Sequence, residues 1–117
     1  MGTKKETIRK TYQVRISLNA LKNIDEITGF IAFINLQPLN ALKVGNKIFE
    51  IIDCIEKVPY AFRECEELPS KTKMYRKAVC FSWLIIYKVK ADDIIILGII
   101  HSSRKPSIIK TLKNVKK

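Results

Sequence analysis

The stretch that decides the fold runs from Met74 to Ser102 and reads MYRKAVCFSWLIIYKVKADDIIILGIIHS. It is rich in β-branched and aromatic residues, which favour strands. Two short connections, Phe81-Ser82 and Ala91-Asp92, divide it, and connections of two residues join antiparallel neighbours. The stretch therefore predicts three consecutive antiparallel strands: Met74–Cys80, Trp83–Lys90 and Asp93–Ser102.

One further strand and two helices are predicted before this stretch. Tyr12, Val14 and Ile16 alternate with polar residues, which is the period of a strand with one buried face. Apolar residues then recur at spacings of three and four over Leu21–Ile34 and again over Ala41–Ile55. That spacing is typical of amphipathic helices.

Polar residues and prolines mark the ends of these helices. Ser17 or Asn19 is available to cap the first helix, and Pro38 can stand in the first turn of the second. Pro59 ends the second helix. From Val58 to Lys73 the chain has two prolines, several glutamates and no period, so we expect a loop there.

The element order β-α-α-β-β-β predicts a two-layer α+β fold, in which a helical hairpin packs on one face of a small, mostly antiparallel four-stranded sheet. A chain of 117 residues has room for one domain only. We expect its core to span about residues 11–110, with basic tails at both ends. The segment Pro106–Val115 is expected to form a short amphipathic helix or a loose tail.

The last two strands have apolar residues on both faces. Ile85 and Tyr87 point opposite to Ile86, and Ile94 and Ile96 likewise point opposite to their neighbours. Two helices can cover only one face of the sheet. We therefore expect the outer face to be left bare by the hairpin and to meet the tail, a partner chain or another copy.

The net charge of +11 lies almost wholly in the second part of the chain. From Met1 to Glu67 there are 10 Lys/Arg and 9 Asp/Glu, whereas from Leu68 to Lys117 there are 12 and 2. A one-sided positive field attracts phosphate backbones, acidic protein segments or anionic lipid head groups. A solvated surface without a partner is the alternative.

Cysteine usage and hydropathy indicate a cytoplasmic protein that needs no metal or other cofactor. Cys54, Cys65 and Cys80 form no C-x-x-C pair, so neither a zinc site nor a disulfide framework is expected, and Cys54 and Cys80 lie in apolar sequence typical of a core. The first ten residues lack the apolar region of a signal peptide. The longest apolar run, Ile94–Ile100, is far shorter than the roughly 20 residues that span a bilayer, so no membrane is expected as a partner.

Five segments of the chain carry a resemblance to a known family: Tyr12–Ser17, Met74–Val79, Leu84–Val89, Ile94–Leu97 and Ile99–Pro106. Together they resemble the RelE/ParE family of toxins of type II toxin–antitoxin systems, also described as plasmid-stabilisation or addiction-module toxins. The resemblance covers nearly the whole chain, and the ending Arg104-Lys105-Pro106 is more similar to ParE-like than to RelE-like members.

The resemblance implies a growth-inhibiting toxin that is neutralised by an acidic, partly disordered antitoxin, with operator DNA bound only through the toxin–antitoxin complex. ParE-like members inhibit DNA gyrase and are not enzymes, and this is the expected function. RelE-like members are ribosome-dependent endoribonucleases that cut mRNA, which is the first alternative. A degenerate toxin that binds only antitoxin and operator DNA is the second.

The nuclease alternative makes specific demands on the sequence. RNA cleavage through the 2′-hydroxyl needs a base, a cation for the charged phosphorane and an acid. By resemblance, Arg76 and Arg104 match the two arginines of the RelE-like set, and His101 is available for proton transfer. The tyrosine expected about six residues after the second arginine is replaced by Lys110. Each of these residues also has a structural explanation, such as an ion pair for Arg76 or a turn for Arg104.

The remaining predicted site residues are basic or aromatic. We expect Lys71, Lys73, Lys77, Lys105 and Lys110 to bind nucleic acid or the target, and Tyr75, Trp83 and Tyr87 to bind the antitoxin, with core packing as the alternative for the aromatic rings. Gly98 in the last strand is expected to relieve crowding against a helix.

Overall fold

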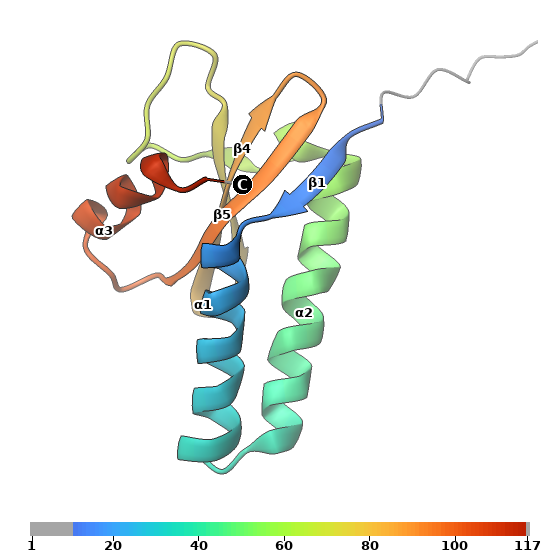
Figure 1. Cartoon of the computed structure of the whole chain (residues 1–117), viewed down its shortest axis with the longest axis vertical. Helices are drawn as coiled ribbons and strands as arrows, with labels where there is room; N and C mark the ends of the chain where they lie inside the picture. Colours follow the sequence, from blue (N-terminus) through green and yellow to red (C-terminus); the bar gives the residue numbers. More distant parts are fainter. Residues whose placement is uncertain (1–10, 117) are drawn as a thin grey trace, which may run out of the picture.

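The computed structural model describes residues 11–116, in which five strands form one sheet (Figure 1). The spatial order is β1-β5-β4-β3-β2, with β1 parallel to β5 and all other pairs antiparallel. The predicted α+β class, hairpin and mostly antiparallel sheet are confirmed. The strands are β1 (Gln13–Ile16), β2 (Arg63–Glu64), β3 (Tyr75–Cys80), β4 (Trp83–Lys90) and β5 (Asp93–His101).

The predicted count of four strands is wrong by one. The additional strand β2 is two residues long and lies in the segment that was expected to be a loop. It exists because Arg63 and Glu64 pair with Lys77 and Arg76 of β3. A short 3-10 turn, η3 (Pro59–Ala61), precedes it.

Two helices form the predicted hairpin, and the C-terminal segment forms a third short helix. Helix α1 (Leu18–Gly29) continues into the π-helical turn η2 (Phe30–Ile34), and α2 (Pro38–Lys57) runs back beside it. Figure 1 shows that α1 and α2 run on beyond the end of the sheet. The C-terminal elements are α3 (Pro106–Thr111) and η4 (Leu112–Asn114).

Ser17 caps α1 and ties it to the sheet. Its Oγ accepts a hydrogen bond from the Ala20 backbone N at 3.0 Å and donates one to the Leu97 carbonyl at 3.1 Å. Asn19, the other predicted cap, instead donates from Nδ2 to the same carbonyl at 3.0 Å. Leu97 is available because a bulge in β5 leaves it without a partner residue in β4.

Gly98 lies where three segments meet. A Cβ on this residue would lie 2.9 Å from Leu112 Cδ2 and 3.1 Å from both Asn19 Nδ2 and Asn23 Oδ1. The expectation that Gly98 relieves crowding against a helix is therefore confirmed, with α1 on one side and η4 on the other.

The main hydrophobic core lies between the hairpin and the inner face of the sheet. The α2 residues Val44, Ile48 and Ile52 pack with sheet residues such as Ile85 and Ile96. Ile48, Ile85 and Ile96 are completely buried. Residue spacing thus identified the buried stripe of α2 correctly.

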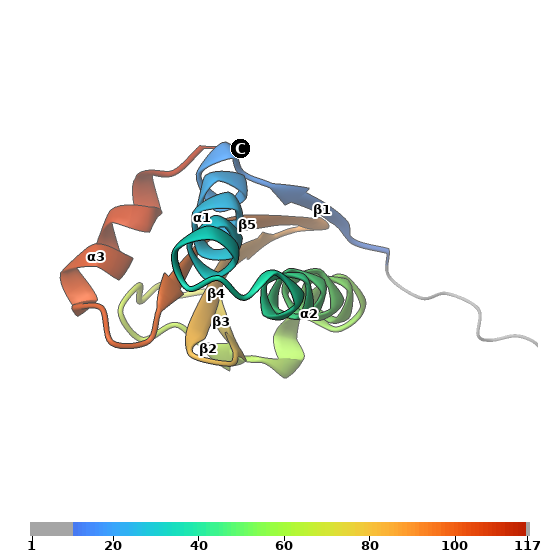
Figure 2. The same cartoon turned by 90° about the horizontal axis from the view of Figure 1, so that it is seen from below.

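The outer face of the sheet, which the hairpin leaves bare as expected, carries a second core built by other parts of the same chain. Ile86, Ile95 and Leu97 of the sheet are covered by Ile109 and Leu112 of the C-terminal segment. Cys65 and Leu68 of the loop after β2 complete the cover. Figure 2 shows α3 on one side of the molecule, apart from α2. Of the three predicted occupants, the protein's own tail fills the face, with help from this loop.

The three cysteines are free thiols. Cys65 and Cys80 are buried, and Cys80 belongs to the main core. The prediction that Cys54 is a core residue is wrong, because it lies on the exposed side of α2. No helix within residues 11–116 is long and apolar enough to cross a membrane.

Candidate binding surfaces

Arg76 lies on β3, where its guanidinium group is held by the protein itself. Its Nε donates to the Lys73 carbonyl at 3.0 Å and its Nη1 to the Phe62 carbonyl at 3.1 Å. The guanidinium carbon also lies 4.9 Å from the centre of the Tyr60 ring, a cation–π contact. These contacts give Arg76 a structural role in joining β3 to the segment around η3.

His101 and Arg104 lie together at the end of β5. The Ser103 backbone N donates to His101 Nδ1 at 3.1 Å, and Ser103 Oγ lies 2.7 Å from the same nitrogen. The Arg104 backbone N donates to the His101 carbonyl at 3.0 Å, which closes the predicted turn. Trp83 packs edge-on against the imidazole with the ring centres 5.8 Å apart. The Arg104 side chain is exposed.

The sheet register keeps Arg76 away from this cluster. Arg76 is opposite Tyr87, which is opposite Ile96 on β5, whereas His101 is opposite Trp83. The row of Arg76 therefore crosses β5 five residues before His101. At about 3.3 Å per residue this is roughly 16 Å along the strand. The structure brings His101 and Arg104 together and leaves Arg76 apart.

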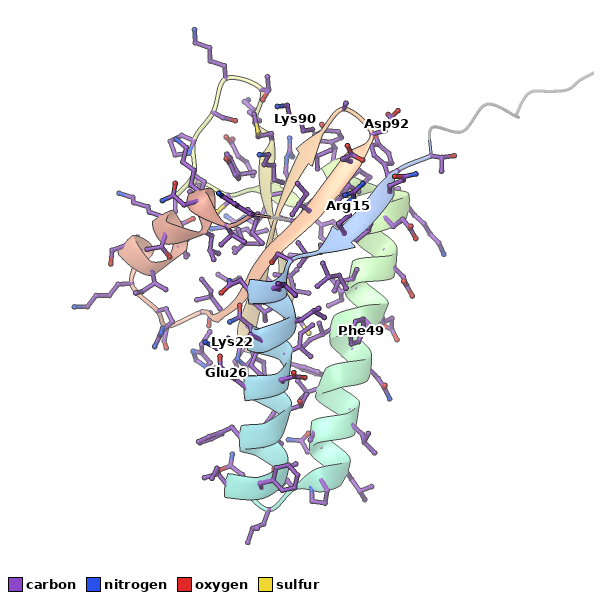
Figure 3. All side chains as sticks on the ribbon, viewed as in Figure 1. Arg15, Lys22, Glu26, Phe49, Lys90 and Asp92 are labelled. Carbon is purple, nitrogen blue, oxygen red and sulfur yellow. The ribbon has the colours of Figure 1, made fainter. Side chains whose placement is uncertain are left out.

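A cavity of about 280 Å³ adjoins His101 and Arg104. The sequence interpretation did not include its other polar lining residues, Asn23, Glu26 and Thr111. They come from α1 and α3, and no motif in the sequence joins these helices to the end of β5. Figure 3 shows Glu26, with Lys22, on the flank of α1.

The five predicted target-binding lysines differ in availability. Lys77 is only 11% exposed, and its Nζ lies 3.2 Å from Glu67 Oε1 and 3.9 Å from Glu66 Oε1. Burial opposes ionisation of Glu67, but a backbone hydrogen bond and Lys77 outweigh it and hold the pKa of this carboxyl below its ordinary value. Lys77 is therefore occupied by an internal ion pair. The others are exposed: Lys71, Lys73, Lys105 and Lys110.

The aromatic residues predicted to bind the antitoxin are mainly core residues. Tyr75 is 6% exposed in the second core, and Tyr87 is completely buried in the main core, where burial raises its pKa. The Tyr87 hydroxyl donates to the Pro59 carbonyl. Both rings are thus packed in a core, which was the alternative given for the aromatic residues. Trp83 is partly exposed beside His101.

The hairpin carries an apolar surface that the sequence interpretation missed. The large exposed side chains of η2, of the connection after it and of α2 are called the hairpin surface: Phe30, Phe33, Ile34, Leu36, Leu39, Leu42 and Phe49. Several of them belong to a second stripe on α2, in which Leu39, Leu42 and Phe49 recur at spacings of three and seven. That stripe was the available signal, and it was overlooked because the buried stripe already accounted for the helix.

Within residues 11–116, no three His, Cys, Asp or Glu side chains gather as ligands for a metal ion. The ionisable groups whose pKa is raised most are the buried side chains of Tyr87 and Cys65. Burial, with the nearby Glu67 carboxylate, raises the pKa of Cys65 to about 11, so this thiol is protonated at neutral pH.

Comparison with known proteins shows which family and which solved structure this chain is similar to. A family model described as the ParE toxin of type II toxin–antitoxin system, parDE, matches residues 14–106. Among solved structures, a chain of "Chromosomal ParDE TA system from P. aeruginosa" superposes with a TM-score of 0.65 and 21% identity. The match covers 80% of this chain and 98% of that chain, and at this identity it shows a shared fold. No curated protein matches the sequence significantly.

Proposed function

Because this chain belongs to the ParE toxin family of type II toxin–antitoxin systems, we propose that it arrests growth by inhibiting DNA gyrase and that a cognate antitoxin neutralises it. Gyrase inhibition would be a binding function with no reaction of its own. The observation that carries the choice of target is the separation of Arg76 from His101 and Arg104. We also propose that the protein acts in the cytoplasm, where its target lies.

The separation counts against a nuclease of the RelE-like kind. Groups that stabilise and protonate one scissile phosphate must all lie within hydrogen-bonding reach of it, about 3 Å. Arg76 is roughly 16 Å along the strand from His101. Two of its guanidinium nitrogens already donate to the Lys73 and Phe62 carbonyls. A phosphate held by Arg104 would thus lack the second arginine.

The antitoxin partner is proposed from family membership and from charge. The similar solved structure is described as a ParDE toxin–antitoxin system. In this chain the exposed lysines of α3 and of the loop before β3 leave a positive surface, which would attract an acidic segment. The antitoxin would lie over this cover of the sheet and not on the sheet face itself. The exposed lysines are Lys71, Lys73, Lys105, Lys110 and Lys113.

The nuclease alternative keeps one supporting observation. His101 and Arg104 share the 280 Å³ cavity with Glu26 and Thr111, which gives an acid–base group and a cation in one place. A ribosome-dependent enzyme that cuts mRNA would therefore be centred there and would not use Arg76. A degenerate toxin, which binds only antitoxin and operator DNA, would show neither activity.

One pair of assays separates these functions. Purified toxin is added to gyrase with relaxed plasmid, and in parallel to a translating extract in which mRNA integrity is followed. We expect loss of supercoiling with intact mRNA, and restoration of supercoiling by the product of the adjoining gene. Cleavage within coding regions, abolished by His101→Ala or Arg104→Ala, would establish the nuclease instead. Arg76→Lys is the control for these two variants, because it keeps the positive charge and loses the two guanidinium hydrogen bonds. A nuclease centred on His101 and Arg104 would not need Arg76.

A further inference from the structure

The cavity at the end of β5 has an acidic and a basic side chain on its walls that do not pair with each other. Its volume is about 280 Å³, and residues of α1, of the end of β5 and of α3 line it. Glu26 and Arg104 both belong to the lining, yet neither makes an ion pair with any residue from 11 to 116. Two opposite charges that share a cavity without meeting suit a ligand that carries the complementary charges.

Two hydrogen bonds fix α1 along β5 and thereby position Glu26. Asn19 Nδ2 donates to the Leu97 carbonyl at 3.0 Å, and the Ile99 backbone N donates to Asn23 Oδ1 at 2.9 Å. The helix and the strand therefore run in the same direction. Glu26 comes one helical turn after Asn23, which brings it level with the end of β5. Figure 3 shows Glu26 on this flank of α1.

The hydrogen bonds of His101 determine which of its ring nitrogens can donate to a ligand. The Ser103 backbone N donates to Nδ1 at 3.1 Å, so Nδ1 is an acceptor and carries no proton. The neutral imidazole then has its proton on Nε2. His101 and Arg104 thus supply donors at the β5 end of the cavity, which suit a carboxylate.

The groups from the two helices supply acceptors. The ionised Glu26 carboxylate can only accept hydrogen bonds. Thr111 Oγ1 donates its own proton to the Ile108 carbonyl at 2.6 Å, so towards a ligand it is an acceptor as well. Acceptors of this kind suit an ammonium group, which has three donors and no acceptor. The edge of a nucleobase fits less well, because it presents donors and acceptors side by side.

The remaining walls are apolar, and the cavity is small. Ile27, Trp83 and Ile108 line it from α1, β4 and α3. Pockets for small molecules usually measure about 300–1,000 Å³, so this cavity lies at the lower end of their range. It therefore suits a molecule of the size of a single amino acid, with an apolar part against these three side chains.

We propose that this cavity binds a free α-amino acid with an apolar side chain. Arg104 and His101 Nε2 bind its carboxylate, and Glu26 binds its ammonium group. The bound molecule joins α1 to the segment that carries α3, and it thereby stabilises the cover of the outer sheet face. This inference depends neither on gyrase nor on mRNA as the target.

Isothermal titration calorimetry of the purified full chain tests the proposal, with L-leucine and L-phenylalanine as probes. We expect saturable binding of one molecule per chain with a dissociation constant of about 1 mM or tighter. Two analogues of L-leucine test the two charges separately. L-leucinamide lacks the carboxylate and 4-methylpentanoate lacks the ammonium group, and each should bind at least about tenfold more weakly through the loss of charge-assisted hydrogen bonds.

Variants of the chain test the same two contacts. Glu26→Gln and Arg104→Gln each remove one charge from an exposed side chain and should each weaken binding at least about tenfold. Lys22→Gln is the matched control and should bind like the wild type. Lys22 is exposed on α1 one turn before Glu26 and is not part of the lining (Figure 3).

Three results would overturn the proposal. The first is a wild type that binds neither amino acid. The second is binding that survives both Glu26→Gln and Arg104→Gln, with circular dichroism confirming that the variants are folded. The third is a nucleoside monophosphate that binds more tightly than either amino acid. Gyrase and mRNA assays on the same samples report separately on the proposed function.

Discussion

The Tyr87 hydroxyl donates a hydrogen bond to the Pro59 carbonyl, which joins the centre of β4 to the turn that follows α2. The two residues are 28 positions apart in the chain. The ring itself is completely buried and meets Phe62 edge-on, with the ring centres 6.4 Å apart. This bond therefore fixes the end of the hairpin against the sheet.

Tyr87→Phe should destabilise the protein by about 1–3 kcal/mol, because it leaves the Pro59 carbonyl without this donor and keeps the packing of the ring. Urea unfolding followed by circular dichroism measures the change. Tyr75→Phe is the control, since the Tyr75 hydroxyl makes no hydrogen bond to the residues described, and its effect should stay within about 0.5 kcal/mol. Equal losses for the two variants would show that the bond to Pro59 contributes nothing.

Gly98→Ala should cost about 1–3 kcal/mol, because the added methyl group lies 2.9 Å from Leu112 Cδ2 and 3.1 Å from two asparagine side chains. The asparagines cannot move freely, as both hold backbone groups of β5. Gly29→Ala is the matched control in open space and should stabilise by up to about 1 kcal/mol through helix propensity. Thermal unfolding of the two variants should thus shift in opposite directions, and a neutral Gly98→Ala would contradict the close approach.

Ala91 adopts a left-handed backbone conformation in the turn between β4 and β5, with φ of 54°. This conformation costs an ordinary L-residue about 1–2 kcal/mol and costs glycine little. Ala91→Gly should therefore raise the free energy of unfolding by about 0.5–1 kcal/mol, after the greater entropy of glycine in the unfolded chain is subtracted. Ala61→Gly, at an exposed residue outside the group with positive φ, should lower it. If both variants lowered the free energy of unfolding, the backbone at Ala91 would not be strained.

The raised pKa of the Cys65 thiol leads to a prediction of how the free energy of unfolding changes at alkaline pH. Burial, with the nearby Glu67 carboxylate, raises the pKa of this thiol from its ordinary value of 9.0 to about 11 in the folded protein, so the unfolded chain loses the thiol proton first. The protonated thiol therefore contributes its full share of the free energy of unfolding below pH 9.0. This share is lost as the pH rises toward 11. The variant Cys65→Ala loses stability because it leaves a cavity, and this loss does not depend on pH. The difference in free energy of unfolding between the wild type and the variant should therefore become smaller as the pH rises through this window. Urea midpoints at neutral pH and near pH 11 measure it, and a constant gap would contradict the shift.

Local patterns in the sequence predict most of the elements. The turn residues Phe81-Ser82 and Ala91-Asp92 placed β3, β4 and β5 to within one residue, because a two-residue connection leaves no other pairing. Helix spacing likewise identified Val44, Ile48 and Ile55 as buried. By contrast, β2 has no periodic signal, since two residues become a strand only when β3 lies beside them.

The candidate site was harder to predict because its contacts come from distant segments. The partners of Arg76 are backbone carbonyls of Phe62 and Lys73, and any residue type could supply them. The arrangement of His101 and Arg104 beside Glu26 requires the position of α1 relative to β5. Apolar residues on both sheet faces correctly indicated a second layer. They could not indicate that Ile109 and Leu112 of the same chain would provide it.

The parallel pairing of β1 with β5 has a consequence for the protein while it is being synthesised. Strand β1 is made first and β5 near the end, yet β5 lies between β1 and β4 in the sheet. On a nascent chain, β1 and the two long helices therefore have no finished layer to pack on until Asp93–His101 has left the exit tunnel. A message that ends before Asp93 would yield a product unable to fold, so a frameshift anywhere upstream of this strand should abolish toxicity.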